Sequence, residues 1–451
     1  MKVKFFVSIS LQLITWLFCF SCLTPKNPQV NTLKMFLHQP SHHNYYQSDP
    51  VDEQPEILWQ FKTDGQVVSS PVVSDGVVYV GSEDHRLYAL DAETGLAKWH
   101  FQTEGPISST PAVSYDKVFF LSYDGNFYAL NKGTGKLQWK FSTGGESKFK
   151  VKDYFNGSFQ PDFWDFFLSS PALDPSTVYF GSSDGNIYAL DRETGKKRWS
   201  YRTGASIHSS PALYENYLVT GAWDSRIYCL DKNNGAIKWV YTTGRDTTKY
   251  IWMGIQASPS IDEGIVFIGS RDAKLYALQL ETGDTLWTQS DFEGSWLPGS
   301  AAIDQTNLYC GSSDAFSFYS IDKLSGRINY RTNLDSYAFS SPAVINEMAY
   351  LGAANGRLYG INLDDGLINW EFQTNGSRTD SIRLFNQQGK LDTAKAQFLL
   401  KDIKDMPTLS ALYQKIFGSV GAILSSPSIA NGILYFGSCD GHIYAISSKI
   451  P

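Results

Sequence analysis

Paired serines and recurring aspartates are the residues of this chain whose types and spacing could do chemistry. Ser169 and Ser170 stand together, and Asp184 and Asp191 follow in the same stretch. A serine hydroxyl can act as a nucleophile and a carboxylate as a general base. The same arrangement recurs, however, at intervals of about forty residues along the chain. Groups repeated so regularly belong to a structural repeat, so we expect them to shape turns and packing rather than to catalyse a reaction.

The repeat has eight copies with the same landmarks. Each copy begins with a Ser-Ser-Pro triplet or a variant of it, and each later carries an acidic or amide residue in a hairpin. The triplets begin at Ser69, Ser109, Ser169, Ser209, Ala257, Gly299, Ser340 and Ser425. The hairpin residues are Asp84, Asp124, Asp184, Asp224, Asp272, Asp314, Asn355 and Asp440. A chain built in this way is one large repeat domain rather than several unrelated domains.

The copy from Ser169 to Trp199 predicts four short antiparallel strands. Two of its runs, 177–181 and 186–190, are β-branched and aromatic, and the Asp184-Gly185 link between them suits a tight hairpin. Both runs are apolar on both faces, so the sheet needs a neighbour on each side. The repeat therefore predicts small sheets that stack on one another.

The two ends of the repeat region are complementary. The fourth strand of a copy carries an aromatic landmark, and these are Trp59, Trp99, Trp139, Trp199, Trp239, Trp287, Tyr330 and Trp370. The last copy stops at His442–Ser447 without a fourth strand, whereas Ile57–Thr63 is a fourth strand with no three before it. Their pairing would remove the exposed edges of a linear stack. We therefore expect residues 57–447 to form an all-β, eight-bladed β-propeller of four-stranded antiparallel blades, closed by strand 57–63.

Charge and cysteine usage exclude some classes of function. The formal net charge is −7 and lysines and arginines do not cluster in the sequence, which argues against a nucleic-acid partner. Cys229, Cys310 and Cys439 occupy repeat positions and are expected to be buried or idle thiols. The sequence has no phosphate-binding glycine loop, no HExxH motif and no nucleophile elbow. We assign no catalytic residue and no metal-binding residue.

The residues before the propeller predict an exported protein. Residues 1–21 combine two lysines with an apolar run from 5 to 20, as a signal peptide does. The segment from Cys19 to Cys22 resembles a bacterial lipoprotein box, which implies lipidation of Cys22 and, with Leu23 after it, retention at the outer membrane. Residues 22–56 should form a tether, and 35–45 within them resembles the lead-in found before many propellers of this repeat type, which implies a segment that docks on the domain. The pair His42-His43 could suggest a metal site, but adjacent side chains on an extended chain point apart, so we expect a docked or solvated loop.

Insertions between copies are the departures from the repeat. They fall at 145–168, 245–256, 291–298 and 377–420, each between the outer strand of one blade and the inner strand of the next, so all lie on one face. Aromatic side chains on loops often anchor partners. The residues that we expect to bind a partner are Phe163, Trp164, Tyr250, Trp252 and Trp296. Alternatively, these side chains pack on one another and cap the ring.

The largest insertion, 377–420, predicts a small helical hairpin in the last repeat. Ala396, Leu399 and Ile403 lie at helical spacing before Pro407, and Leu409 and Ile416 repeat that spacing after it. The two apolar stripes could pack together and onto the insertion face. They could instead dock a helix or strand of a partner.

The repeats Ser69–Trp99 and Ser169–Trp199 resemble the PQQ-type propeller repeat SSPxVxxGxVYxGSxDGxLYALDxxTGxxxW, and the resemblance covers nearly all of Ile57–Ser447. Together with the lipoprotein-like leader, it is closest to the BamB-like outer-membrane assembly lipoproteins. This resemblance implies a monomeric, non-catalytic lipoprotein of the cell envelope, anchored to the outer membrane on its periplasmic or surface face. It further implies a scaffold for envelope proteins that takes part in the assembly of outer-membrane β-barrels.

The same repeat family contains enzymes. The PQQ-dependent alcohol and sugar dehydrogenases hold PQQ with calcium, and the alcohol enzymes typically carry an adjacent Cys-Cys pair, which this chain lacks. A quinoprotein dehydrogenase is therefore the alternative, and only that alternative brings in PQQ and calcium. A carbohydrate- or peptide-binding module is a third interpretation, because aromatic platforms suit such ligands as well.

Overall fold

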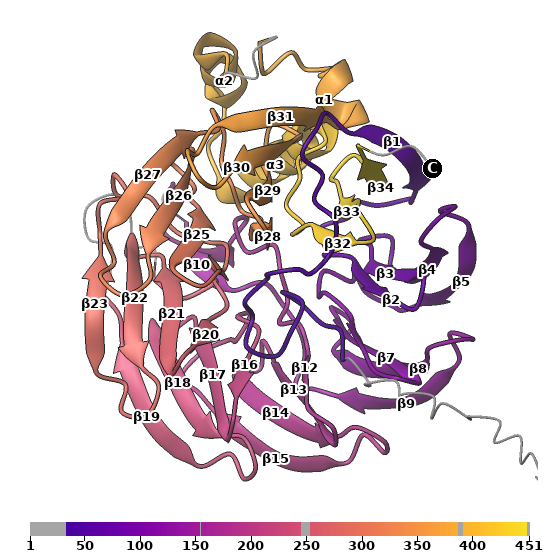
Figure 1. Cartoon of the computed structure of the whole chain (residues 1–451), viewed down its shortest axis with the longest axis vertical. Helices are drawn as coiled ribbons and strands as arrows, with labels where there is room; N and C mark the ends of the chain where they lie inside the picture. The colour runs from indigo at the N-terminus through magenta and orange to yellow at the C-terminus, as the bar shows by residue number, and fades with distance from the viewer. Residues whose placement is uncertain (1–32, 154, 245–252, 387–390, 449–451) are drawn as a thin grey trace, which may run out of the picture. The chain divides into compact units, whose positions relative to one another are not determined.

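The computed structural model describes residues 33–153, 155–244, 253–386 and 391–448. Eight four-stranded antiparallel sheets stand around a ring, with the strand that follows each entry triplet innermost (Figure 1). The predicted eight-bladed β-propeller is confirmed. The predicted sites Cys22, Tyr250 and Trp252 lie outside the described residues.

The strands follow the chain blade by blade. The first four blades are β2 (Val72–Ser74), β3 (Val77–Gly81), β4 (Arg86–Asp91), β5 (Ala97–Gln102); β6 (Ala112–Val113), β7 (Lys117–Ser122), β8 (Asn126–Asn131), β9 (Leu137–Ser142); β12 (Ala172–Leu173), β13 (Thr177–Gly181), β14 (Asn186–Asp191), β15 (Lys197–Arg202); and β16 (Ala212–Tyr214), β17 (Tyr217–Ala222), β18 (Arg226–Asp231), β19 (Ile237–Thr242).

The remaining blades continue the pattern. They are β20 (Ser260–Asp262), β21 (Ile265–Ser270), β22 (Lys274–Gln279), β23 (Thr285–Gln289); β24 (Ala302–Ile303), β25 (Asn307–Gly311), β26 (Ser317–Asp322), β27 (Ile328–Asn333); β28 (Ala343–Ile345), β29 (Met348–Gly352), β30 (Arg357–Asn362), β31 (Ile368–Gln373); and β32 (Ser428–Ala430), β33 (Ile433–Gly437), β34 (His442–Ser447), β1 (Glu56–Lys62). In the last blade β1 pairs antiparallel with β34, from Glu56 opposite Ser447 to Lys62 opposite His442. The first strand thus completes the last sheet.

The aromatic landmark of each outer strand fastens its blade to the next. Trp99 donates its indole N–H to the Lys132 carbonyl at 3.1 Å, and Tyr330 uses its hydroxyl on the Leu363 carbonyl at 2.9 Å. Trp59, Trp139, Trp199, Trp239 and Trp287 make the equivalent bond at 2.7–3.2 Å. Trp370 bonds the carbonyl of Val51, which precedes β1. The landmarks are therefore blade-to-blade latches.

The insertions add a hairpin and three helices. The hairpin is β10 (Lys150–Lys152) with β11 (Phe159–Pro161), and the helices are α1 (Asn375–Thr379), α2 (Thr393–Leu400) and α3 (Met406–Val420). Asp392 and Asp405 cap α2 and α3 by accepting the N–H groups of Lys395 and Thr408. The helices predicted for the largest insertion are therefore found in the structure as α2 and α3. In the described part of the chain, no helix is both long and apolar enough to span a membrane.

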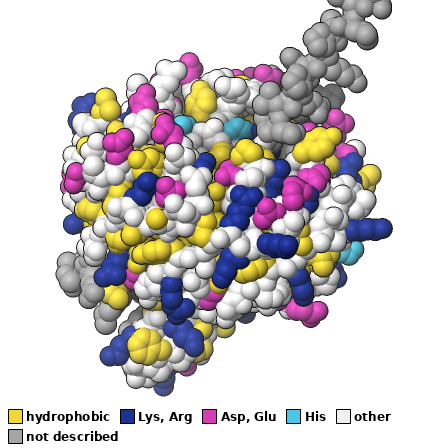
Figure 2. Space-filling view, turned by 90° about the horizontal axis from the view of Figure 1, so that it is seen from below, with side chains coloured by type: hydrophobic (Ala, Val, Ile, Leu, Met, Phe, Trp, Pro, Cys, Tyr) yellow, Lys and Arg dark blue, Asp and Glu magenta, His cyan; other side chains and the backbone are white. Residues whose placement is uncertain are grey.

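On the side seen in Figure 2, acidic and basic side chains are interspersed, with hydrophobic side chains between them. The thiols of Cys229, Cys310 and Cys439 are buried and form no disulfide bond. Burial raises the pKa of Cys229 and of Cys310 to about 12, so both thiols stay protonated at neutral pH.

Candidate functional site: a channel capped at both ends

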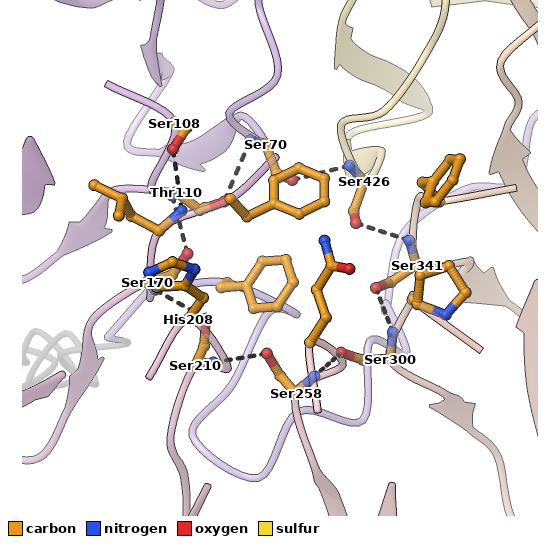
Figure 3. A pocket seen from close by; sticks show the side chains of 17 residues that line it. Ser70, Ser108, Thr110, Ser170, His208, Ser210, Ser258, Ser300, Ser341 and Ser426 are labelled. Carbon is orange, nitrogen blue, oxygen red and sulfur yellow. Dashed lines mark hydrogen bonds between the residues drawn. The ribbon is translucent and has the colours of Figure 1, made fainter. Parts of the chain in front are cut away.

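A closed ring of hydroxyl groups surrounds the central channel (Figure 3). The middle residue of each entry triplet accepts a hydrogen bond from the backbone N–H of its counterpart in the preceding blade. The bonds run Ser70 to Thr110, then to Ser170, Ser210, Ser258, Ser300, Ser341, Ser426 and back to Ser70, at 2.8–3.2 Å. All eight side chains are buried. These serines join the inner strands of neighbouring blades, as the repeat predicted for them.

Six of the triplets begin with a serine, whose hydroxyl makes hydrogen bonds within its own blade or to the next blade. Ser169 accepts the N–H of Gly181 at 2.9 Å and donates to the carbonyl of Ser209 at 3.1 Å. The Ser340 and Ser425 hydroxyls bridge both backbone groups of Gly352 and Gly437. With both hydroxyl functions occupied, these serines are structural groups rather than nucleophiles.

Two positions of the repeat vary from blade to blade on the insertion side of this ring. One is the residue before the entry triplet, which is Val68, Ser108, Leu168, His208, Gln256, Pro298, Phe339 and Leu424 in blade order. The other is the residue before the hairpin acid, which is Glu83, Tyr123, Ser183, Trp223, Arg271, Ser313, Ala354 and Cys439. Polar members gather in the first five blades and apolar members in the seventh and eighth. The mouth of the channel therefore has a polar side and an apolar side.

On the polar side, Asp165 of the first insertion binds His208. Its Oδ1 lies 2.8 Å from Nδ1 of His208, and both side chains are fully buried. The other ring nitrogen, Nε2, lies 2.8 Å from the Ser183 hydroxyl, which in turn donates to Glu146 at 2.8 Å. Nε1 of Trp223 approaches Nδ1 at 3.2 Å. These contacts tie the insertion to blades three and four.

The charges of this network favour a protonated imidazole. Burial alone would lower the pKa of His208, but the Asp165 carboxylate outweighs it, and the pKa lies above its ordinary value. Burial raises the pKa of Glu146, although Ser182 and Ser183 donate to its carboxylate. The raised pKa of His208 favours its ion pair with Asp165, and Nε2 shares a hydrogen bond with the Ser183 hydroxyl.

Ser183, His208 and Asp165 have the order of a hydrolytic triad, and their hydrogen bonds decide against that chemistry. A nucleophilic serine must pass its proton to the histidine. Here the Ser183 hydroxyl proton points to Glu146, and the Ser183 N–H, a possible oxyanion donor, is also bonded to Glu146 at 2.9 Å. The set is an ion network that holds the insertion in place.

A second ion pair lies beside the first. Asp162 accepts a hydrogen bond of 2.5 Å from the Arg271 guanidinium, and both side chains are buried. Arg271 also donates to Gln256, whose amide donates to the Trp164 carbonyl at 2.9 Å. The guanidinium lies 4.2 Å from the ring centre of Trp223. Two aspartates of one insertion are therefore paired with cations of two successive blades.

On the apolar side, α3 and the first insertion share one hydrophobic cluster. Trp164 stacks on Phe339 at 5.5 Å between ring centres and lies 4.9 Å from Tyr413 of α3. Of the residues predicted to bind a partner, Phe163, Trp164 and Trp296 are 5%, 9% and 8% exposed. They pack together in this cluster, the arrangement that the alternative interpretation foresaw. Little of their ring surface is available to a partner, and such a role stays a prediction.

The lead-in closes the opposite end of the channel. In Figure 1 it crosses the centre of the ring on the viewer's side. Its backbone bonds the innermost strands of five blades, through Val113, Leu213, Ile261, Ile303 and Val344. His42 is buried with Nδ1 2.8 Å from the Pro259 carbonyl, and His43 places Nε2 2.6 Å from the Ile261 carbonyl. The adjacent histidines serve separate backbone contacts rather than one metal.

Little space remains between the two caps. Phe36 of the lead-in and Phe167 of the first insertion both line a cavity of about 30 Å³, together with the hydroxyl ring, His208 and Gln256. That volume holds water but not a tricyclic quinone. In the described part of the chain, no three His, Cys, Asp or Glu side chains are grouped so as to hold a metal ion. The channel residues therefore do not fit PQQ with calcium.

The cap residues Asp162, Asp165, His208 and Arg271 were not anticipated. Their signal was nevertheless present in the sequence. His208 and Arg271 are ionisable residues at repeat positions that most other blades fill with uncharged residues, and two aspartates flank Phe163-Trp164 in the insertion. Substitutions at repeat positions therefore indicate where the cap lies, just as the insertions do.

These features define a PQQ-type repeat β-propeller with its channel closed by its own chain. The chain belongs to the family described as outer membrane protein assembly factor BamB, whose model matches residues 51–154, 158–290 and 271–398. No curated protein matches the chain.

Solved structures share the fold at low sequence identity. A europium-containing methanol dehydrogenase is 13% identical with a TM-score of 0.64, covering 92% of this chain and 98% of its own. The quinohemoprotein alcohol dehydrogenase of Comamonas testosteroni is 13% identical with a TM-score of 0.64, covering 91% and 80%. BamB from Moraxella catarrhalis is 18% identical with a TM-score of 0.48, covering 90% and 96%. At these identities the dehydrogenases show a shared fold and nothing of activity.

Proposed function

We propose that this protein is a non-catalytic lipoprotein of the cell envelope, anchored through Cys22, whose insertion face binds other envelope proteins during the assembly of outer-membrane β-barrels. Membership of the BamB family supports the assembly role. The leader and the lipoprotein-like segment around Cys22 support the anchor. A ring that closes on the chain's own first strand, β1, supports a monomer.

The observation that carries the proposal is the closure of the channel. Phe36 and Phe167 enter the same cavity from the two ends and leave about 30 Å³. The channel of this protein is thus used for packing. The insertions gather on one face, so we place the binding function on the surface of that face.

Photo-cross-linking in intact envelopes tests this proposal. The cross-linker is placed at Ser147, Asp291 and Ala411, which are exposed on insertions of one face. Asn216 and Glu347, exposed in turns between first and second strands on the opposite face, serve as controls. We expect adducts with β-barrel assembly proteins from the first set only. Equal adducts from both sets, or none from the insertion positions, would refute the proposal.

The dehydrogenase alternative and the anchor have tests of their own. Purified protein mixed with PQQ and calcium should show no bound chromophore and no dye reduction. Cys22→Ala should abolish acyl labelling and release the protein from membranes. Reduction of the dye would reinstate the enzyme, and unchanged labelling would remove the anchor.

A further inference from the structure

Two insertions carry strongly exposed phenylalanine side chains. Phe159 of β11 is 70% exposed and Phe398 of α2 is 58% exposed. Phe155 and Leu400 are exposed on the same two insertions, whereas the other exposed large apolar residues, Tyr115 among them, lie in turns and outer strands of the blades, where such exposure is ordinary. The exposed rings therefore need a separate explanation.

Lysines surround these rings in a protein of net charge −7. Lys150 and Lys152 are exposed on β10, and Lys401 and Lys404 are exposed after α2. Nζ of Lys401 lies 4.0 Å from the ring centre of Phe398. The acidic residues here are Asp402, which is exposed, Asp153, which is buried, and the helix caps Asp392 and Asp405.

The two lysine-bearing elements adjoin each other. Asp153, next to Lys152, accepts the backbone N–H of Met406 at 3.3 Å, just after Lys404. Val151 and Ile403 both pack on the hydrophobic cluster of the cap. We call residues 150–161 together with 393–404 the basic arm.

We propose that the basic arm lies against a membrane surface rich in anionic phospholipid. Exposed phenylalanines insert at the boundary between headgroups and acyl chains, while lysines keep their ammonium groups beside the phosphates. A protein partner fits less well, because lysine is depleted at protein interfaces. The inference rests on the envelope location proposed above. Contact between the basic arm and the membrane would hold the insertion face close to the bilayer in which barrels assemble.

Vesicle co-sedimentation tests this proposal on the chain from residue 23 onward, which keeps every described element and lacks the leader and Cys22. The probes are phosphatidylcholine vesicles with and without about a third of phosphatidylglycerol. We expect binding to the anionic vesicles only, and its loss in concentrated salt. Each lysine contributes about fivefold to membrane partitioning, so Lys150→Gln with Lys152→Gln should lower it by about twentyfold.

Matched variants separate the arm from general surface effects. Phe159→Ser with Phe398→Ser should lower binding to anionic vesicles at unchanged thermal stability, because both rings are exposed. Leu96→Ser with Lys136→Gln, at exposed turn positions of the opposite face, should leave binding intact. Equal binding to both vesicle types, no binding, unchanged binding by the arm variants, or capture by soluble polyglutamate instead of vesicles would overturn the proposal. Cross-linking at Ser147 and Ala411 reports the protein partner separately, so either proposal can fail alone.

Discussion

Asp165 and His208 lie 2.8 Å apart in full burial, one on an insertion and the other at the entry of the fourth blade. The pair joins the cap to the ring at the point where the repeat pattern is broken. Taking one partner away leaves the other as an uncompensated buried charge, which costs far more than loss of an exposed pair.

Asp165→Asn should therefore destabilise the protein by about 3 kcal/mol or more, because it leaves His208 without its counter-charge. Urea unfolding followed by tryptophan fluorescence measures the change. Glu193→Gln, which removes a 58% exposed carboxylate from its bond to Lys117, is the control and should cost less than about 1 kcal/mol. Equal losses in the two variants would contradict the buried ion pair.

The cap should stabilise the folded protein more at mildly acidic pH than at alkaline pH. His208 and Glu146 have pKa values raised in the folded protein, and so does Asp162, where burial outweighs Arg271. A group with a raised folded pKa binds its proton more tightly when folded, so its stabilisation is present below the unfolded pKa and is lost as pH rises through the folded value. The His208→Gln variant should show a smaller fall in stability between about pH 6 and pH 8.5. An identical pH profile would contradict this assignment.

The propeller ring could be predicted from the sequence because the residues that build it recur at regular intervals. Ser70, Ser170 and Ser210 occur at corresponding positions of their repeats, and residues at the same place in successive blades must meet around a closed ring. The pairing of Ile57–Thr63 with the last repeat followed from the same count. What periodicity could not supply is the hydrogen bond from Ser426 to Ser70, which depends on how closely the inner strands approach.

The cap could not be predicted because its partners come from non-periodic segments. Trp164 was expected at a partner surface, and it is buried because α3, which begins more than two hundred residues later, supplies Tyr413 against it. Asp162 and Arg271 likewise carry no spacing rule that would link them. Such contacts between insertions are set by the three-dimensional face on which the insertions converge.

The lead-in should respond to pH in the opposite sense to the cap. Burial lowers the pKa of His38 and of His42 to about 4. A histidine with a lowered folded pKa resists protonation when folded, so stability falls as pH drops below about 6.5 toward 4. Protonation of His42 alone would lower the free energy of unfolding by roughly 3 kcal/mol over that pH range. Limited proteolysis within residues 33–46 should therefore accelerate at pH 5 relative to pH 7, with a non-ionisable His42→Gln variant showing less change. Cleavage that is independent of pH in the native protein would refute the prediction.

The hydroxyl ring should tolerate threonine but not alanine. Ser70→Ala removes the acceptor of the buried Ser426 N–H, and an unsatisfied buried donor costs about 1–3 kcal/mol. Ser70→Thr keeps the acceptor, as Thr110 does in the next blade, and should recover most of the loss. Thermal unfolding of the two variants decides the matter. Equal stability of the alanine and threonine variants would show that the bond contributes little.

The latch between blades should make Gly135 irreplaceable while leaving Gly76 replaceable. Both glycines have positive φ, +67° and +71°. A Cβ at Gly135 would lie 2.6 Å from the ring of Trp99, whereas a Cβ at Gly76 has no atom within 4 Å. Gly76→Ala should therefore cost about 1 kcal/mol for its backbone conformation alone, and Gly135→Ala should cost more because the Trp99 ring must move.

A double-mutant cycle isolates the latch itself. In a Trp99→Ala background the clash at Gly135 is gone, so Gly135→Ala should cost there no more than Gly76→Ala does. The difference between the two backgrounds, measured by urea unfolding, is the coupling between one blade's outer strand and the next blade's turn. Additive losses would mean that Trp99 and Gly135 act independently. A Trp or Tyr side chain contacts the equivalent glycine at seven blade junctions. Coupling between Trp99 and Gly135 would therefore indicate the same coupling at the other junctions around the propeller.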